Sequence, residues 1–213
     1  ISEVRTAQPG LDVDQYVEFV GVPGASLDGL QFVVIGDLEG AFPPEQNGGV
    51  EIVVQLSGVF PPDGVFLLAN DSYSLGDADQ VATFDFESGE NLTMILADGF
   101  AGQVGDDLDS DDDGALDRNS INIVDSMAML VDASPDGFGA EYYYSDNTVG
   151  PVAGFAPLHA WRCTDTGAWR PGTDDIGGTN ETPGSINPDC GGGGGGPDGL
   201  ILNELRIDHS GAD

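Results

Sequence analysis

One twelve-residue segment, residues 106–117, concentrates acidic side chains, because seven of its residues are aspartate. Three of these alternate along the backbone and are followed at once by a glycine: Asp109, Asp111, Asp113 and Gly114. Calcium takes roughly six to eight oxygen ligands at about 2.3–2.6 Å, and alternating carboxylates on a curling loop can converge on one such ion. The glycine permits the sharp turn that such a loop requires. The spacing therefore predicts a calcium-binding loop.

The same pattern predicts the remaining ligands. The backbone carbonyl of Ala115 occupies the peptide-ligand position, and Asp117 is expected as a direct or water-bridged ligand. An EF-hand loop closes with a bidentate glutamate, but Ser120 occupies that place here and no flanking helices are evident. We therefore expect a loop similar to those of dockerin or thrombospondin repeats, inserted in a β-domain, with the missing ligand supplied by Asp107 or Asp125.

Two alternatives for this segment stay open. A second register of four alternating aspartates can hold a second ion: Asp107, Asp109, Asp111 and Asp113. The segment can also be a solvated acidic loop without an ion, although carboxylates packed this closely repel one another unless a cation lies between them. Magnesium fits less well than calcium, because it prefers octahedral sites and keeps its waters.

The whole chain is strongly acidic: 38 Asp and Glu against five Lys and Arg give a formal net charge of −33. Such a field repels nucleic acid and anionic lipid, and like charges destabilise a compact fold unless counter-ions neutralise them. No stretch approaches the roughly 20 apolar residues needed to cross a membrane. We therefore expect no nucleic-acid partner and no membrane insertion. The acidity serves either solubility in a salty medium or the binding of divalent cations.

The chain has two cysteines, Cys163 and Cys190. Their spacing fits no metal site, and no third cysteine or nearby histidine pair completes one. We expect a disulfide between them, with two unpaired thiols as the alternative. A disulfide indicates an oxidising compartment, and so an extracellular or cell-surface location.

Residues suited to acid–base chemistry are scattered. His159 and His209 are far apart, and no serine-nucleophile or zinc-protease motif accompanies either. Glu3 and Glu18 occupy alternating strand positions, which predicts outward-facing side chains or an ion pair with Arg5 rather than catalytic acids. The sequence therefore predicts a non-catalytic protein.

Aromatic residues near the end of the chain allow two interpretations. Trp161, Trp169 and the run Tyr142–Tyr144 can form a patch on which sugars stack, or they can be core and strand-edge residues. The second interpretation is the commoner one for such residues, and we favour it.

The elements that position these residues follow from apolar alternation and from turn residues. Residues 30–35 are nearly all apolar, as in a central strand buried on both faces. The predicted strands are 1–6, 16–21, 30–35, 50–56, 64–69, 91–97, 121–125, 127–131, 141–144 and 160–162. With 33 glycines, 13 prolines and no convincing helical stripe, the pattern predicts an all-β, immunoglobulin-like sandwich of about seven to ten strands, with the acidic loop as an insertion.

Several segments resemble one known family. The similar segments are ISEVR at 1–5, DVDQYVEFV at 12–20, LDGLQFVVI at 27–35 and TPGSIN at 182–187. Together with the acidic loop they resemble the lamin-tail domain family, and more closely its bacterial extracellular members. Gln31 and Phe32 stand where many members carry a tryptophan. The resemblance covers about residues 1–190. It implies an immunoglobulin-like, usually non-catalytic module of secreted and surface proteins, sometimes found beside nuclease or phosphatase domains.

The end of the chain repeats its beginning. Residues 1–12 align without a gap on residues 202–213, and a six-glycine run precedes the second copy. We therefore expect a domain at 1–190, a Gly-rich linker at 191–199, and the first strand of a second, similar repeat at 200–213. Chance similarity between two short strands is the alternative.

The tail also predicts an interaction. Its apolar strand residues are Leu200, Ile201, Leu202 and Leu205. Because an unpaired strand tends to pair with a sheet edge, we expect it to add to the sheet of another copy. The expected partners are thus neighbouring repeats of the same protein or other copies of it. A flexible connection between independent domains is the alternative.

Three classes of function follow. The first is a calcium-stabilised structural or adhesive repeat of a secreted or cell-surface bacterial protein. The second is an accessory module of a secreted hydrolase such as a nuclease or phosphatase. The third is a carbohydrate-binding module that uses the aromatic residues and calcium. The internal repeat and the Gly-rich linker favour the first class.

Overall fold

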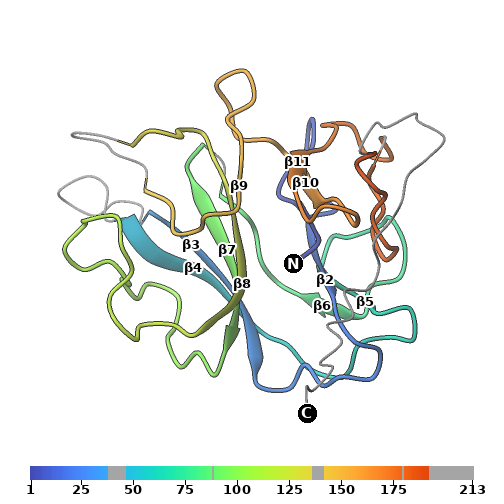
Figure 1. Ribbon diagram of the computed structural model, residues 1–213, viewed down its shortest axis with the longest axis horizontal. Coiled ribbons are helices and arrows are strands. Elements are labelled where there is room, and N and C mark those ends of the chain that lie inside the picture. The colour runs from blue at the N-terminus through green and yellow to red at the C-terminus, as the bar shows by residue number, and fades with distance from the viewer. Residues whose placement is uncertain (38–46, 88, 136–141, 179, 192–213) are drawn as a thin grey trace, which may run out of the picture.

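The computed structural model describes residues 1–37, 47–87, 89–135, 142–178 and 180–191. In these residues eleven strands form two sheets, which lie against each other as the layers of a sandwich (Figure 1). The all-β prediction is confirmed. No helix in the described part of the chain is long and apolar enough to cross a membrane.

The first sheet has six strands in the order β11-β10-β1-β2-β5-β6. Their bounds are β1 Glu3–Arg5, β2 Tyr16–Val20, β5 Val65–Asn70, β6 Gln80–Ala82, β10 His159–Arg162 and β11 Trp169–Pro171. Neighbours run antiparallel except β5 and β6, which are parallel. Strand β1 is therefore an internal strand, paired on both sides.

The second sheet has five strands in the order β4-β3-β7-β8-β9. Their bounds are β3 Leu30–Asp37, β4 Asn47–Gln55, β7 Leu92–Asp98, β8 Ile123–Met129 and β9 Thr148–Val149. Only the β8–β9 pair is parallel. The predicted strands 121–125 and 127–131 are one strand, β8, and residues 142–144 have irregular backbone rather than the predicted strand.

The main core lies between the sheets. On the six-stranded side it is lined by alternate residues of β2 and β5, such as Val17, Phe19 and Leu68. Facing them are Phe32 and Met94 of the other sheet. The rings of Phe19 and Phe32 meet edge to face, 6.0 Å apart. Burial of apolar surface between two sheets is the main favourable term in a fold of this kind.

Strand β3 is buried on both faces, as its apolar sequence predicted. Phe32 and Val34 point into the main core, whereas Val33 and Ile35 belong to a second apolar cluster on the outer face. Phe100 and Leu108 complete that second cluster. They come from the long connection between β7 and β8, which contains the acidic loop. The sheet is thus covered outside by the segment that carries the candidate site.

Strand β4 carries two bulges, at Glu51 and at Gly48. Val34 and Ile35 are adjacent in β3, but they pair with Ile52 and Val50, so Glu51 is the extra residue. Further along, Gly36 pairs with Gly49 and Asp37 with Asn47, which makes Gly48 extra. Gly48 has a φ of +85°, which favours glycine. Bulges often redirect side chains next to functional sites, and an acidic cluster adjoins each of these two.

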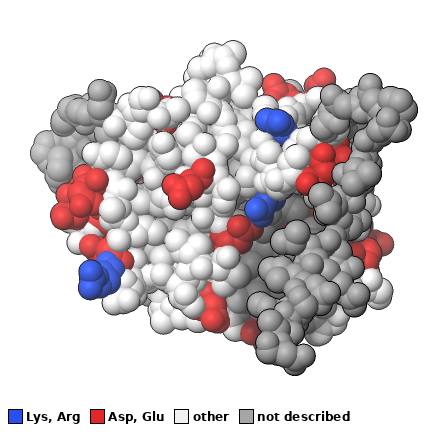
Figure 2. Space-filling view, viewed as in Figure 1, with Lys and Arg blue, Asp and Glu red and all other residues white. Residues whose placement is uncertain are grey.

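The surface reflects the composition. On the face shown in Figure 2, acidic side chains lie both at the margin and in the middle of the face, and basic side chains are few. Arg5, one of the five basic residues of the sequence, is fully buried and so contributes nothing to the surface. The predicted linker from 192 onward and the predicted tail strand, with Leu200, Ile201, Leu202 and Leu205, lie outside the described residues.

Candidate metal centre

The acidic loop is docked on the edge of β4 by its backbone. The amide of Val50 donates to the carbonyl of Asp106 at 2.8 Å, and the amide of Leu108 donates to the carbonyl of Gly48 at 2.9 Å. A Cβ on Gly48 would lie 2.6 Å from the Cβ of Asp109, so only glycine allows the loop this close. The buried side chain of Leu108 packs in the outer apolar cluster and holds the loop from below.

Asp109 is the buried anchor of the loop, with 0% exposure. Its Oδ1 accepts the amide of Asp113 at 3.1 Å. Its Oδ2 accepts the amide of Gly114 at 2.9 Å and the hydroxyl of Tyr144 at 2.9 Å. These bonds fold residues 109–114 back around one carboxylate.

Three carboxylates meet in this loop. Asp109, Asp111 and Asp113 each offer an oxygen, and these oxygens lie within 4.8 Å of one another. Two ligands on opposite sides of a calcium ion are about 5 Å apart, so the three oxygens are close enough to share one ion. Repulsion from Asp113, followed by partial desolvation and repulsion from Asp109, raises the pKa of Asp111. A cation at this point would relieve that repulsion.

The loop backbone turns sharply at two points. Asp112 has a φ of 49° and Gly114 a φ of 82°, both in the left-handed region. The glycine is therefore needed where the sequence pattern placed it. Outside the turn, the amide of Asn47 donates to Oδ1 of Asp112 at 3.1 Å, and the side chain of Asn47 accepts the amide of Tyr142 at 2.8 Å. The loop is thus held between β4 and the segment that follows β8.

The other predicted ligands, Asp107, Asp117 and Ala115, form hydrogen bonds with the backbone and side chains of the acidic loop. Oδ1 of Asp107 accepts the amide of Asp109 at 3.0 Å, and Oδ2 of Asp117 accepts the amide of Ser110 at 3.3 Å. Ala115 follows the turn directly, and its amide donates to Asp113. Ser120 has a buried hydroxyl oxygen with no hydrogen-bond partner.

Asp125, the second candidate for the missing ligand, lies on β8. Its carboxylate forms an ion pair with Arg162 at 3.3 Å, and it is not among the three residues whose oxygens converge.

Cys163 and Cys190 form a disulfide, with Cα atoms 5.2 Å apart. It closes a loop of sequence separation 27 that includes most of the segment covering the outer face of the six-stranded sheet. The pairing agrees with the expectation from the sequence. Because both sulfurs are bonded to each other, they are not free thiolate ligands for a metal.

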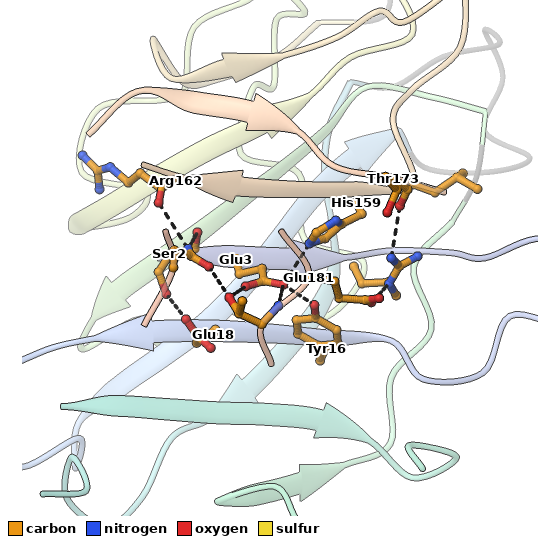
Figure 3. A network of polar contacts seen from close by, with 12 residues as sticks. Ser2, Glu3, Tyr16, Glu18, His159, Arg162, Thr173 and Glu181 are labelled. Atoms are coloured by element: carbon orange, nitrogen blue, oxygen red, sulfur yellow. Dashed lines mark hydrogen bonds and ion pairs between the residues drawn. The ribbon is translucent and has the colours of Figure 1, made fainter. Parts of the chain in front are cut away.

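Glu3 and Glu18 face away from the core, as predicted, but both side chains are 0% exposed rather than in contact with solvent. They lie on the outer face of the six-stranded sheet, and residues 173–178 and 180–187 cover that face (Figure 3). Oε1 of Glu3 contacts Nε2 of His159 at 2.9 Å and accepts the hydroxyl of Tyr16. Burial, followed by repulsion from Glu3, raises the pKa of Glu18 to about 8.

The ion-pair partner of Arg5 is also different from the one expected. Arg5 binds Glu181 through Nε, and its other nitrogens donate to backbone carbonyls, among them Asp174 at 3.1 Å and Thr173 at 3.2 Å. Thr182 donates to Glu3 through its amide at 3.0 Å and through its hydroxyl at 2.8 Å. The network therefore fastens the covering segment to the sheet, and its buried groups have no surface at which to meet a substrate.

Both tryptophans are buried, in agreement with the favoured interpretation that they are core or strand-edge residues. Trp161 and Trp169 are 5% and 9% exposed, so neither offers a face on which a sugar could stack. Tyr144 is half-buried and its hydroxyl is committed to Asp109. The two tryptophans therefore do not contribute to a sugar-stacking patch, which was the less favoured interpretation of these aromatic residues.

No protein-family model, no curated protein and no solved structure matches this chain.

Proposed function

We propose that this domain is a calcium-stabilised, non-catalytic structural or adhesive module of a secreted or cell-surface bacterial protein, with an immunoglobulin-like sandwich of the lamin-tail kind. The observation that carries the proposal is the convergence of Asp109, Asp111 and Asp113 within 4.8 Å, in a loop already shaped by its own hydrogen bonds. The ion would lie outside the sheet, where the loop crosses the edge of β4.

Calcium suits this site better than other common metals. The converging ligands are all carboxylate oxygens, which favours hard cations over zinc or copper. Asp111 and Asp113 are exposed, so an ion can enter and keep bound water. The carbonyl of Ala115, Asp117 and the hydroxyl of Ser120 are oxygen donors that can complete an irregular shell, which calcium tolerates and magnesium does not.

An ion at this site would stabilise the fold. The loop bridges β4 and the segment around Tyr144, and its backbone pairs with Val50 and Gly48. A ligand that binds only the folded state adds its binding free energy to stability. In calcium-rich surroundings the module would therefore be rigid, which suits a structural role outside the cell. The disulfide and the acidic composition support that location.

Strand donation by the tail remains part of the proposal, with a constraint. The tail is similar in sequence to the segment that contains β1, but β1 is an internal strand between β10 and β2. A donated strand in another copy would therefore have to pair with a free edge such as β6 or β11, or displace β1. The alternative, independent domains connected by a flexible linker, requires neither step.

Calorimetric titration of chelator-treated protein with calcium tests the proposal. We expect the double variant Asp111→Asn/Asp113→Asn, which keeps the size of both side chains, to bind one calcium ion fewer than the wild type. The matched control is Asp77→Asn. Asp77 is an exposed aspartate between β5 and β6 of the six-stranded sheet. Equal binding by the double variant and the wild type would contradict the proposal.

A further inference from the structure

A second group of carboxylates lies on the same sheet, outside the acidic loop. Asp37, Glu51 and Glu90 offer oxygens that lie within 4.8 Å of one another. Asp37 ends β3, Glu51 is the bulged residue of β4, and Glu90 comes two residues before β7. Two neighbouring strands and the residue just ahead of a third thus each contribute one acid to a single point.

We infer that Asp37, Glu51 and Glu90 form a second site for a divalent cation of the oxygen-preferring class, with calcium as the best-matched ion. The inference does not depend on the acidic loop, because it uses different residues at a different bulge of β4.

Gly36 provides the space in which the carboxylates meet. A Cβ on Gly36 would lie 2.2 Å from Oε1 of Glu51 and 2.7 Å from Oε2 of Glu90. Both side chains therefore cross over this glycine, from strands on its two sides. Any larger residue would push the two carboxylates apart. The sequence thus leaves room for a close approach of like charges that would otherwise be unfavourable.

The burial and hydrogen bonding of Glu90 indicate that the cluster takes up a positive charge. It is only 5% exposed, and its Oε2 accepts the amide of Asp37 at 2.8 Å. Its Oε1 is buried and has no hydrogen-bond partner. A buried carboxylate oxygen without a partner is destabilising in general, unless it is protonated or bound to a cation. The open oxygen belongs to the residue that points into the cluster.

Two species could neutralise the cluster: a cation or a proton. Burial, followed by repulsion from Glu51, raises the pKa of Glu90 well above its usual range, so in the absence of a cation this carboxyl holds a proton. Three converging carboxylates carry more negative charge than one proton can offset, whereas a divalent cation offsets two charges and accepts all three ligands. We therefore favour the cation, and protonation is the competing outcome in the test.

The test uses the full chain and measures bound calcium by equilibrium dialysis at about 0.15 M salt, where loosely held counter-ions are screened. The background is the double variant Asp111→Asn/Asp113→Asn, which lacks the acidic-loop site. We expect this protein to retain one bound calcium, and Glu90→Gln added to it to abolish that binding. Asp77→Asn serves as the control and should change nothing.

The outcomes separate the two sites. If the double variant is folded and binds no calcium, the second site is wrong, whatever the acidic loop does. If wild type loses calcium only with Glu90→Gln, the acidic-loop proposal fails and the second site stands. If Glu90→Gln raises the unfolding temperature equally with calcium and with EGTA, and binding is unchanged, the cluster is neutralised by a proton and the inference is overturned. Glu51→Gln repeats the test should Glu90→Gln fail to fold.

Discussion

The hydroxyl of Tyr144 donates a hydrogen bond of 2.9 Å to Oδ2 of Asp109. Tyr144 lies between β8 and β9, whereas Asp109 lies between β7 and β8, so this bond ties two connections of the sheet together. Burial, followed by the hydrogen bond to Asp109, raises the pKa of Tyr144, so the hydroxyl keeps its proton and remains a donor. The side chain of Asp109 is thus held in place by a residue outside the acidic loop.

Replacement of Tyr144 by phenylalanine removes this donor and should destabilise the domain. A half-buried hydrogen bond to a charged group contributes roughly 1–2 kcal/mol, and we expect a loss of that size in the free energy of unfolding. Urea unfolding in EGTA measures it. Tyr143→Phe is the matched control, because the neighbouring tyrosine is also half-buried but has no such contact with Asp109. Equal losses in the two variants would show that the bond is unimportant.

The convergence of the loop carboxylates was predictable because it follows from residues that are close together in the sequence. Alternating aspartates before Gly114 imply a turn that brings the carboxylates together, and the structure places three of them within 4.8 Å. The residues outside the loop that hold it in place were not predictable. Asn47 and Tyr144 are distant in sequence, and Gly48 acts through a bulge that no pattern in β4 announces.

Glu18 should make stability depend on pH. Its pKa is raised from 4.5 to about 8 in the folded state, so between these values the folded protein keeps a proton that the unfolded chain releases. The free energy of unfolding should therefore fall as pH rises through this window, and the contribution should be fully present only below it. Urea unfolding at pH 5, 6.5 and 8 compares wild type with Glu18→Gln.

The difference between the two proteins isolates Glu18 from other titrating groups. Glutamine loses one of the bonds from Ser2 and Gly184, which gives a constant offset, but it does not titrate. We therefore expect the wild type to lose stability relative to the variant as pH rises. Parallel curves would mean that Glu18 is not protonated in the folded state.

Gly172 should tolerate no larger residue. A Cβ there would lie 1.7 Å from Nδ1 of His159, which is fully buried against Glu3. Gly172→Ala should therefore displace the histidine and destabilise the domain by about 1–3 kcal/mol, as overpacking generally does. Gly76→Ala is the control, since open space surrounds that glycine. Chemical unfolding distinguishes them, and a neutral Gly172→Ala would show that the buried network adjusts freely.

Removal of the disulfide should loosen the covering segment. The variant Cys163→Ser/Cys190→Ser opens a loop of sequence separation 27, and a loop of that length contributes roughly 3–4 kcal/mol by restricting the unfolded chain. Reductant should lower the urea midpoint of the wild type to that of the serine variant. No response of the wild type to reductant would contradict the prediction.

The strands were mostly predictable, and the failures share a cause. Long apolar segments such as β3 and β7 were recognised because burial on both faces leaves a continuous apolar sequence. Strands β6, β9 and β11 were missed because they have only two or three residues, and β6 and β9 join their sheets by parallel pairing with distant strands. No local alternation marks such strands.

Glu3 and Glu18 were misplaced for a related reason. Alternation correctly put them on the face of β1 and β2 that points away from the core. It could not show that a segment some 170 residues away covers this face and supplies hydrogen bonds from Thr182 and Gly184. A polar residue on an outward face is therefore buried whenever a later segment crosses it, and only the tertiary structure reveals that.

The most direct test of the account is thermal unfolding of the full chain with excess EGTA and with calcium at about 100 times its dissociation constant. Binding to the folded state alone should add about 2.7 kcal/mol, which corresponds to a rise of roughly 5–10 °C for a chain of this size. The rise should be clearly smaller in Asp111→Asn/Asp113→Asn, which lacks the acidic-loop site, and fully kept in Asp77→Asn. An unchanged unfolding temperature in the wild type, or an equal rise in the double variant, would contradict a calcium-stabilised module.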